Sequence, residues 1–257
     1  MQQVEDSRPQ TSFLSNMFYS PTVTVARLLL DSYFRSGWMW GEFVLVLVFF
    51  AALFFPFMEN VAYFYGTSIW DLSAIAILGT AIMVRQSTSA RTYIVLSRLT
   101  SRSAYSRGLM LATGILRIPI FLFFMILVLL THRLLNPTVD NMLIGAIGLL
   151  PVTILASSVT VVLSSPIGTR RKRMVFLAWV ALVLFSISPI FQLPDAVLSV
   201  LSIVRIPLAP IATCYLVSIN GTLPAISLLG FAGIVLYIVV LAFLAGYWLE
   251  QRELLLY

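Results

Sequence analysis

Long apolar runs recur along the chain and are separated by short polar connections. Six runs are long enough to cross roughly 30 Å of hydrocarbon at about 1.5 Å per helical residue. They cover residues 38–58, 69–85, 108–131, 141–164, 174–191 and 225–248. The pattern predicts an all-α membrane protein with six transmembrane helices, in which a polar tail, residues 1–20, precedes a single transmembrane domain, residues 21–257.

The segment before the first expected span, residues 21–36, has two faces when it is read as a helix. Polar side chains share one stripe: Thr24, Arg27, Asp31 and Arg35. Apolar side chains form the other face: Val25, Leu28, Leu29 and Tyr33. Pro21 suits a first helical turn, and Asp31 and Arg35 are spaced to pair across one turn. We expect an interfacial amphipathic helix; an ordinary solvated linker is the alternative.

Two prolines, Pro207 and Pro210, divide residues 192–224 into apolar halves that are each too short to cross the membrane. Short apolar helices that return to the same side are typical of a re-entrant hairpin. Its turn must be covered by protein, because lipid cannot satisfy the polar backbone groups. We therefore expect an outer re-entrant helical hairpin before the last span.

Composition agrees with a lipid environment. The chain is 60% hydrophobic and 10% charged, with a mean hydropathy of +0.99, and no water-soluble domain of this length would tolerate such values on its surface. A net charge of +6 could indicate a nucleic-acid partner in a soluble protein. Here the placement of the charges explains it better, so we expect the lipid bilayer as a partner and no nucleic acid.

The basic residues fall almost entirely on one side of the expected topology. That side holds thirteen of them: Arg8, Arg27, Arg35, Arg85, Arg91, Arg98, Arg102, Arg107, Arg170, Arg171, Lys172, Arg173 and Arg252. The opposite loops hold only Arg133 and Arg205. The positive-inside rule then places both termini in the cytoplasm, and five or seven spans would break the alternation.

The chain lacks the residues of common catalytic and metal sites. A nucleotide-hydrolysing phosphate loop ends in Gly-Lys-Ser/Thr, whereas the only lysine, Lys172, lies in the run TRRKR. His132 is the only histidine and Cys214 the only cysteine, so neither a metal site nor a Ser-His-Asp triad is expected. We predict that this chain is not an enzyme and binds no cofactor, which also weakens the alternative of a lipid-modifying enzyme.

The connection between the second and third expected spans, residues 85–108, reads RQSTSARTYIVLSRLTSRSAYSRG. At about 100° per residue, Arg91, Arg98 and Arg102 fall within about 40° of one another. Apolar side chains lie on another sector: Tyr93, Leu96 and Leu99. We expect a short two-faced cytoplasmic helix over residues 91–105, with one face on the membrane domain and the other toward a partner.

With this segment in view, the chain resembles the permease subunits of type-2 ATP-binding-cassette exporters. The resemblance rests on the amphipathic segment, the arginine and tyrosine pattern of residues 91–108, the six spans and the outer hairpin. It implies a coupling helix that docks into a separate ATPase subunit through Arg91, Tyr93, Arg98, Arg102 and Tyr105. ATP and Mg²⁺ would be bound by that partner, not by this chain.

The same resemblance implies a homodimer or heterodimer of membrane subunits in the plasma (inner) membrane of a prokaryote. It favours export of a lipid-like, peptide or drug-like molecule. Two alternatives stay open: the arginines are plain topology signals, or the chain is a non-transporting six-span scaffold or assembly factor. A neighbouring reading frame that encodes an ATPase would favour the exporter.

One basic residue, Arg117, lies well inside an expected span. A guanidinium at that depth costs about 2.5–3.5 kcal/mol on insertion scales, so it should face a cavity or a partner. Glu42, in the first span, is the nearest acidic residue by depth. Snorkelling of Arg117 to the head groups past Pro119 is the alternative to a paired or substrate-facing role.

Overall fold

The computed structural model describes residues 20–54, 59–87, 102–131, 134–135, 138–164, 174 and 208–250. This part contains seven helices: α2 (Pro21–Arg35), α3 (Trp38–Phe54), α4 (Val61–Ser87), α6 (Arg102–Thr131), α7 (Val139–Leu163), α10 (Ala209–Asn220) and α11 (Ala225–Glu250). Two short strands, β1 (Glu59–Asn60) and β2 (Leu134–Leu135), pair in parallel where α4 begins and α6 has ended. The described part of the chain is therefore almost entirely helical.

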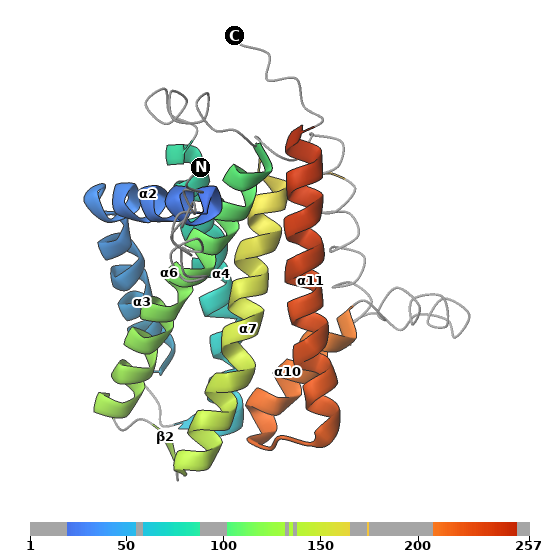
Figure 1. Ribbon diagram of the computed structural model, residues 1–257. Coiled ribbons are helices and arrows are strands. Elements are labelled where there is room, and N and C mark those ends of the chain that lie inside the picture. The colour runs from blue at the N-terminus through green and yellow to red at the C-terminus, as the bar shows by residue number, and fades with distance from the viewer. Residues whose placement is uncertain are drawn as a thin grey trace, which may run out of the picture.

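Four helices are long and apolar enough to cross a membrane: α4, α6, α7 and α11. They run along a common direction, with α3 on one side and α10 at one end (Figure 1). A fifth crossing results if α2 and α3, which bend by 69° at their junction, count as one broken span. The chain is an all-α, multi-pass membrane protein.

The helix ends correct some of the expected boundaries. The second span was expected from residue 69, but α4 begins at Val61, because the helix continues through the weakly hydrophobic stretch around Gly66, Thr67 and Ser68. α6 begins at Arg102 and not at residue 108, so residues 102–105 of the expected coupling helix belong to this long helix. The expected span at 174–191, apart from Met174, lies outside the described residues. So does the first half of the expected hairpin, whereas its second half contains α10.

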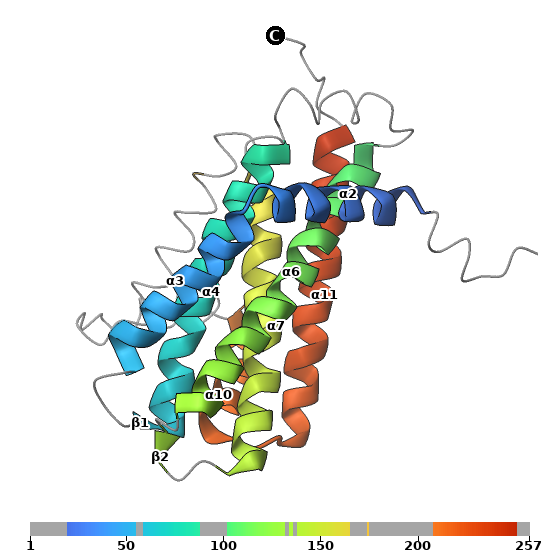
Figure 2. The same cartoon turned by 90° about the vertical axis from the view of Figure 1, so that its left-hand side faces the viewer.

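Helix α2 lies across the long helices near the end of the bundle where α4 and α11 finish (Figure 2). Its junction with α3 contains Gly37, whose φ of 77° is in the left-handed region that favours glycine. The buried face of α2 consists of Val25, Ala26, Leu29 and Tyr33. Leu28 had been expected on this face but is 38% exposed, because it lies about 100° around the helix from Leu29.

The polar stripe of α2 faces outward and carries an exposed ion pair, with Arg35 Nη2 3.0 Å from Asp31 Oδ2. On the opposite face α2 packs against α6 at Gly108, where an added Cβ would lie 2.7 Å from Val25 and 2.8 Å from the Thr22 carbonyl. A larger residue at 108 would push the two helices apart. α2 is thus held closely on the bundle.

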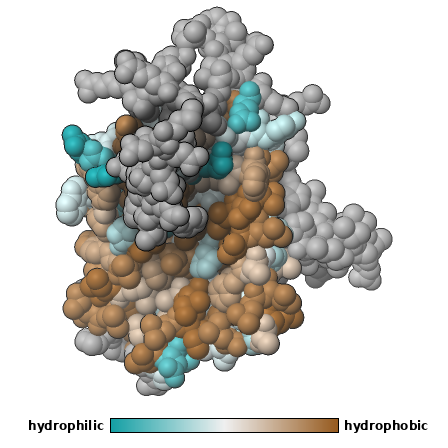
Figure 3. Space-filling view, viewed as in Figure 1, coloured by the Kyte–Doolittle hydropathy of each residue, from teal (hydrophilic) through white to brown (hydrophobic). Residues whose placement is uncertain are grey.

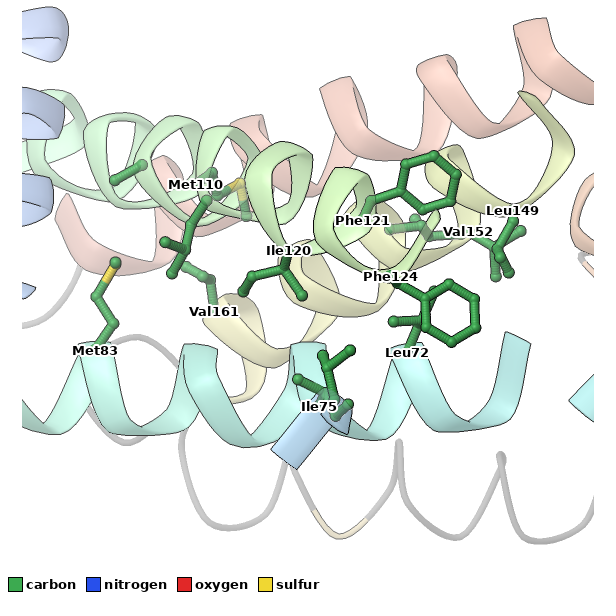
Figure 4. Packing of buried hydrophobic residues seen from close by; sticks show 14 of the residues in the cluster. Leu72, Ile75, Met83, Met110, Ile120, Phe121, Phe124, Leu149, Val152 and Val161 are labelled. Atoms are coloured by element: carbon green, nitrogen blue, oxygen red, sulfur yellow. The ribbon is translucent and has the colours of Figure 1, made fainter. Parts of the chain in front are cut away.

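The core lies between α4, α6 and α7, whose buried side chains interdigitate (Figure 4). Toward the end of the bundle at which β1 and β2 lie, an aromatic cluster joins α3, α4 and α6. Phe64 stacks on Phe124 with 5.4 Å between ring centroids, and Phe54 lies 4.9 Å from Phe64. These contacts and the buried aliphatic side chains join the helices into one core, as expected for close-packed apolar side chains.

The outer surface of the described helices is strongly apolar (Figure 3). Large side chains of α3 and α11 point outward, including Trp40, Val44, Leu229 and Phe243. Such continuous apolar exposure is unfavourable in water and matches the hydrocarbon of a bilayer.

Candidate functional site

Among the described residues, the two charged side chains that are buried, Glu42 and Arg117, form a site with Tyr33 that joins three helices. Glu42 lies four residues into α3, and Arg117 lies fifteen residues into α6, about 22 Å along that helix. Arg117 Nη1 lies 2.8 Å from Glu42 Oε2, and Arg117 Nη2 donates to Glu42 Oε1 at 3.2 Å. Both side chains are only 2% exposed. The structure thus brings together the two intramembrane charges that were expected to match in depth.

Two further contacts complete the site. The Tyr33 hydroxyl, from α2, donates to Glu42 Oε1. Arg117 Nε donates to the Thr113 carbonyl one turn back on α6, at 3.3 Å. Burial, and after it the neighbouring Glu42 carboxylate, raise the pKa of the Tyr33 hydroxyl above its ordinary value, so Tyr33 keeps the proton that it donates. The site therefore ties helix α2 to both α3 and α6.

The Glu42 carboxylate also packs closely against α4. A Cβ atom added at Gly79 would overlap this carboxylate, so the site requires glycine at that position. Gly79 is therefore the contribution of a fourth helix. The buried Glu42 carboxylate is thus paired with the Arg117 guanidinium, accepts a hydrogen bond from the Tyr33 hydroxyl, and leaves no space for a side chain at position 79.

Sequence reasoning identified Glu42 and Arg117 but missed Tyr33 and Gly79. Tyr33 had been placed on the apolar face of α2, and its position nine residues before Glu42 does not indicate a contact until the bend at Gly37 is known. A tyrosine on the apolar face of a helix could have indicated a polar contact, because a buried tyrosine hydroxyl usually has a hydrogen-bond partner. Gly79 carries no signal in a single sequence, because its role depends on the crossing of α3 and α4.

The residues expected to couple to an ATPase are placed less completely. Arg91, Tyr93 and Arg98 lie outside the described residues, and Arg102 is the first residue of α6. Tyr105 is 3% exposed, and its hydroxyl lies 2.6 Å from the Ser87 hydroxyl. This contact joins the end of α4 to the first turn of α6, on either side of the connection 88–101.

The basic side chains near this connection lie at the same end of the bundle. Arg85 belongs to the last turn of α4, and Arg107 to the second turn of α6. Arg27 and Arg35 lie on the outward face of α2, which crosses the bundle near this end (Figure 2). The described helices therefore have a basic end, as the charge pattern of the sequence predicts.

Within the described ranges, no group of three or more His, Cys, Asp or Glu side chains is arranged to hold a metal ion. The Glu42–Arg117 pair is almost fully buried and contacts two other helices, α2 through Tyr33 and α4 at Gly79, an arrangement that suits a structural or mechanical link. A comparison with family models, with curated proteins and with solved structures found none that matches the chain.

Proposed function

We propose that the chain is the membrane-spanning permease subunit of an ATP-driven exporter of the type-2 ATP-binding-cassette class. One observation carries most weight: a surface helix, α2, is tied through Tyr33 and Glu42 to Arg117 in the core of α6. A passive apolar bundle has no need of a charge cluster that costs several kcal/mol to bury. A subunit in which several helices must move together needs such a cluster, because it links those helices mechanically.

The proposal gives the connection 88–101 the role of a docking segment for a cytoplasmic ATPase. Its two ends are held together by the Ser87–Tyr105 contact, so a displacement of the segment would move α4 and α6 jointly. α6 runs without a break from Arg102 to Thr131, and its Arg117 would carry the displacement to α3 and α2. Arg91, Tyr93, Arg98 and Arg102 would contact the ATPase, and Tyr105 would position the segment from within the fold.

The same proposal places both termini and the basic end in the cytoplasm, in a prokaryotic plasma membrane, with a second membrane subunit completing the translocation path. ATP and Mg²⁺ would be bound by the ATPase. The motive for the orientation is the charge asymmetry, since thirteen basic residues would face the cytoplasm and two the outside.

Thiol labelling tests the orientation. Two exposed positions at opposite ends of the bundle, Ser32 and Asn220, are replaced singly by cysteine in a Cys214→Ser background. A membrane-impermeant reagent added to intact cells should label Asn220→Cys and leave Ser32→Cys unmodified until the cells are opened. Labelling of Ser32→Cys from outside would reverse the orientation.

Copurification tests the function. The tagged chain should retain an ATPase subunit and stimulate its ATP hydrolysis in bilayer discs. Arg98→Glu with Arg102→Glu should lower the retained ATPase at least about tenfold, because complementary charges at an interface become like charges. Arg8→Glu with Arg252→Glu makes the same change of net charge outside the connection and should leave the complex intact. An equal loss in both variants, or no ATPase bound to the native chain, would contradict the proposal and favour a scaffold.

A further inference from the structure

A second acidic side chain, Asp71, lies inside a spanning helix. The expected span began at residue 69, only two residues before Asp71, but α4 begins ten residues before it, at Val61. Asp71 is fourteen residues from Arg85 at the basic end, a distance of about 21 Å along the helix. Counted from that end, it lies within the roughly 30 Å of hydrocarbon that a span crosses.

Unlike Glu42, Asp71 has no partner in the part of the chain that the structure describes. Its Oδ2 atom is buried and accepts no hydrogen bond there. The two hydroxyls one turn back on α4 donate elsewhere: Thr67 to the Tyr63 carbonyl at 3.0 Å and Ser68 to the Phe64 carbonyl at 2.7 Å. An unpaired carboxylate at this depth is costly, and such residues are typical of substrate and ion pathways.

The surroundings of Asp71 favour one class of ligand. The side chain is partly exposed, and the residues one and two turns further along the same side of α4, Ala74 and Leu78, are exposed and apolar. A metal ion usually takes several charged or polar ligands, and the described residues place no group of three His, Cys, Asp or Glu side chains together. One carboxylate on an apolar surface matches a molecule that has a single positive charge and an apolar body.

We propose that Asp71 binds the positively charged group of an amphipathic organic cation that reaches α4 from the bilayer. The cation would balance the charge of the partly exposed carboxylate, and its apolar part would lie along Ala74 and Leu78. That the bound cation is also transported rests on the proposed transport function. That Asp71 binds the cation does not depend on an ATPase partner.

The test is equilibrium binding of tetraphenylphosphonium to the full chain in bilayer discs without any ATPase. The native chain should bind the cation saturably, and Asp71→Asn should weaken binding at least about tenfold, since the favourable charge interaction is lost. Asp71→Glu should retain most of the affinity. Asp140→Asn, at an exposed carboxylate in the first turn of α7, removes the same charge elsewhere and should bind like the native chain.

Each result of the binding experiment either supports or contradicts cation binding at Asp71. Absence of saturable binding to the native chain, or equal affinity in Asp71→Asn, would overturn the inference. Thermal unfolding of each variant in the same discs shows whether a loss of binding is a loss of fold, and in that case the Asp71→Glu comparison decides. Because the binding experiment contains no ATPase, a negative binding result does not contradict the proposed ATPase docking. A negative copurification result likewise does not contradict cation binding at Asp71.

Discussion

Replacing Arg117 with leucine is expected to destabilise the folded chain by about 3–5 kcal/mol, because the Glu42 carboxylate then stays buried without its cation. Glu42→Leu should lower the unfolding free energy by a similar amount, since the Arg117 guanidinium then stays buried without its counter-charge. The measurement is reversible unfolding of the purified chain in bilayer discs or mild detergent.

The double variant distinguishes a direct pair from two independent residues. With both charges replaced by leucine, neither group is left uncompensated, so the loss should be smaller than that of either single variant. The exposed Asp31–Arg35 pair is the matched control: Arg35→Leu should change the unfolding free energy by no more than about 1 kcal/mol. Additive losses at positions 42 and 117 would contradict a direct interaction.

Substituting alanine for Gly79 is expected to cost about 1–3 kcal/mol, the usual range for overpacking. Normally the end of a glutamate side chain would move aside for one extra methyl group. Here Arg117 and Tyr33 hold the carboxylate of Glu42, so displacing it breaks the contacts of the site.

A matched control and a second background make this prediction specific. Gly41→Ala places its methyl group 3.6 Å from the Trp38 side chain, an ordinary contact, and should be neutral or slightly stabilising because alanine favours helix. In a Glu42→Leu background, which lacks the held carboxylate, the additional cost of Gly79→Ala should fall. An unchanged cost in that background would show that the glycine serves helix packing and not the charge site.

Periodic hydrophobicity predicted the helical class and the two-faced helix α2, because burial in lipid and burial of one helix face both leave a direct trace in residue order. The end of α2 came within one residue of its expected position, and α7 and α11 within two residues at each end. The start of α4 was wrong, since a hydropathy window finds the hydrocarbon crossing and not the helical turns that extend beyond it.

Of the site, the sequence predicted only the two charged residues, because these can be matched by their expected depth in the membrane. Counting residues from the same membrane side matched Glu42 with Arg117, because a buried charge must be compensated at its own level. The contribution of Tyr33 depends on the 69° bend between α2 and α3, and that of Gly79 on the approach of α4. Both are tertiary features with no periodic signal. Asp71 lay only two residues inside the expected span because the start of α4 was predicted eight residues too late.

We propose that the arginines of the connection 88–101 and the first turn of α6 bind an ATPase through their position and not through charge alone. The most direct measurement is copurification and stimulated ATP hydrolysis of a register variant, Ser97→Arg, Arg98→Ser, Ser101→Arg and Arg102→Ser. This variant keeps the composition, net charge and topology signal of the loop, while each moved arginine turns by about 100° around a helix. We expect normal membrane insertion with loss of the bound ATPase and of stimulated hydrolysis. Full copurification and stimulation by the register variant would show that the arginines act only as topology signals, and would contradict the proposed coupling.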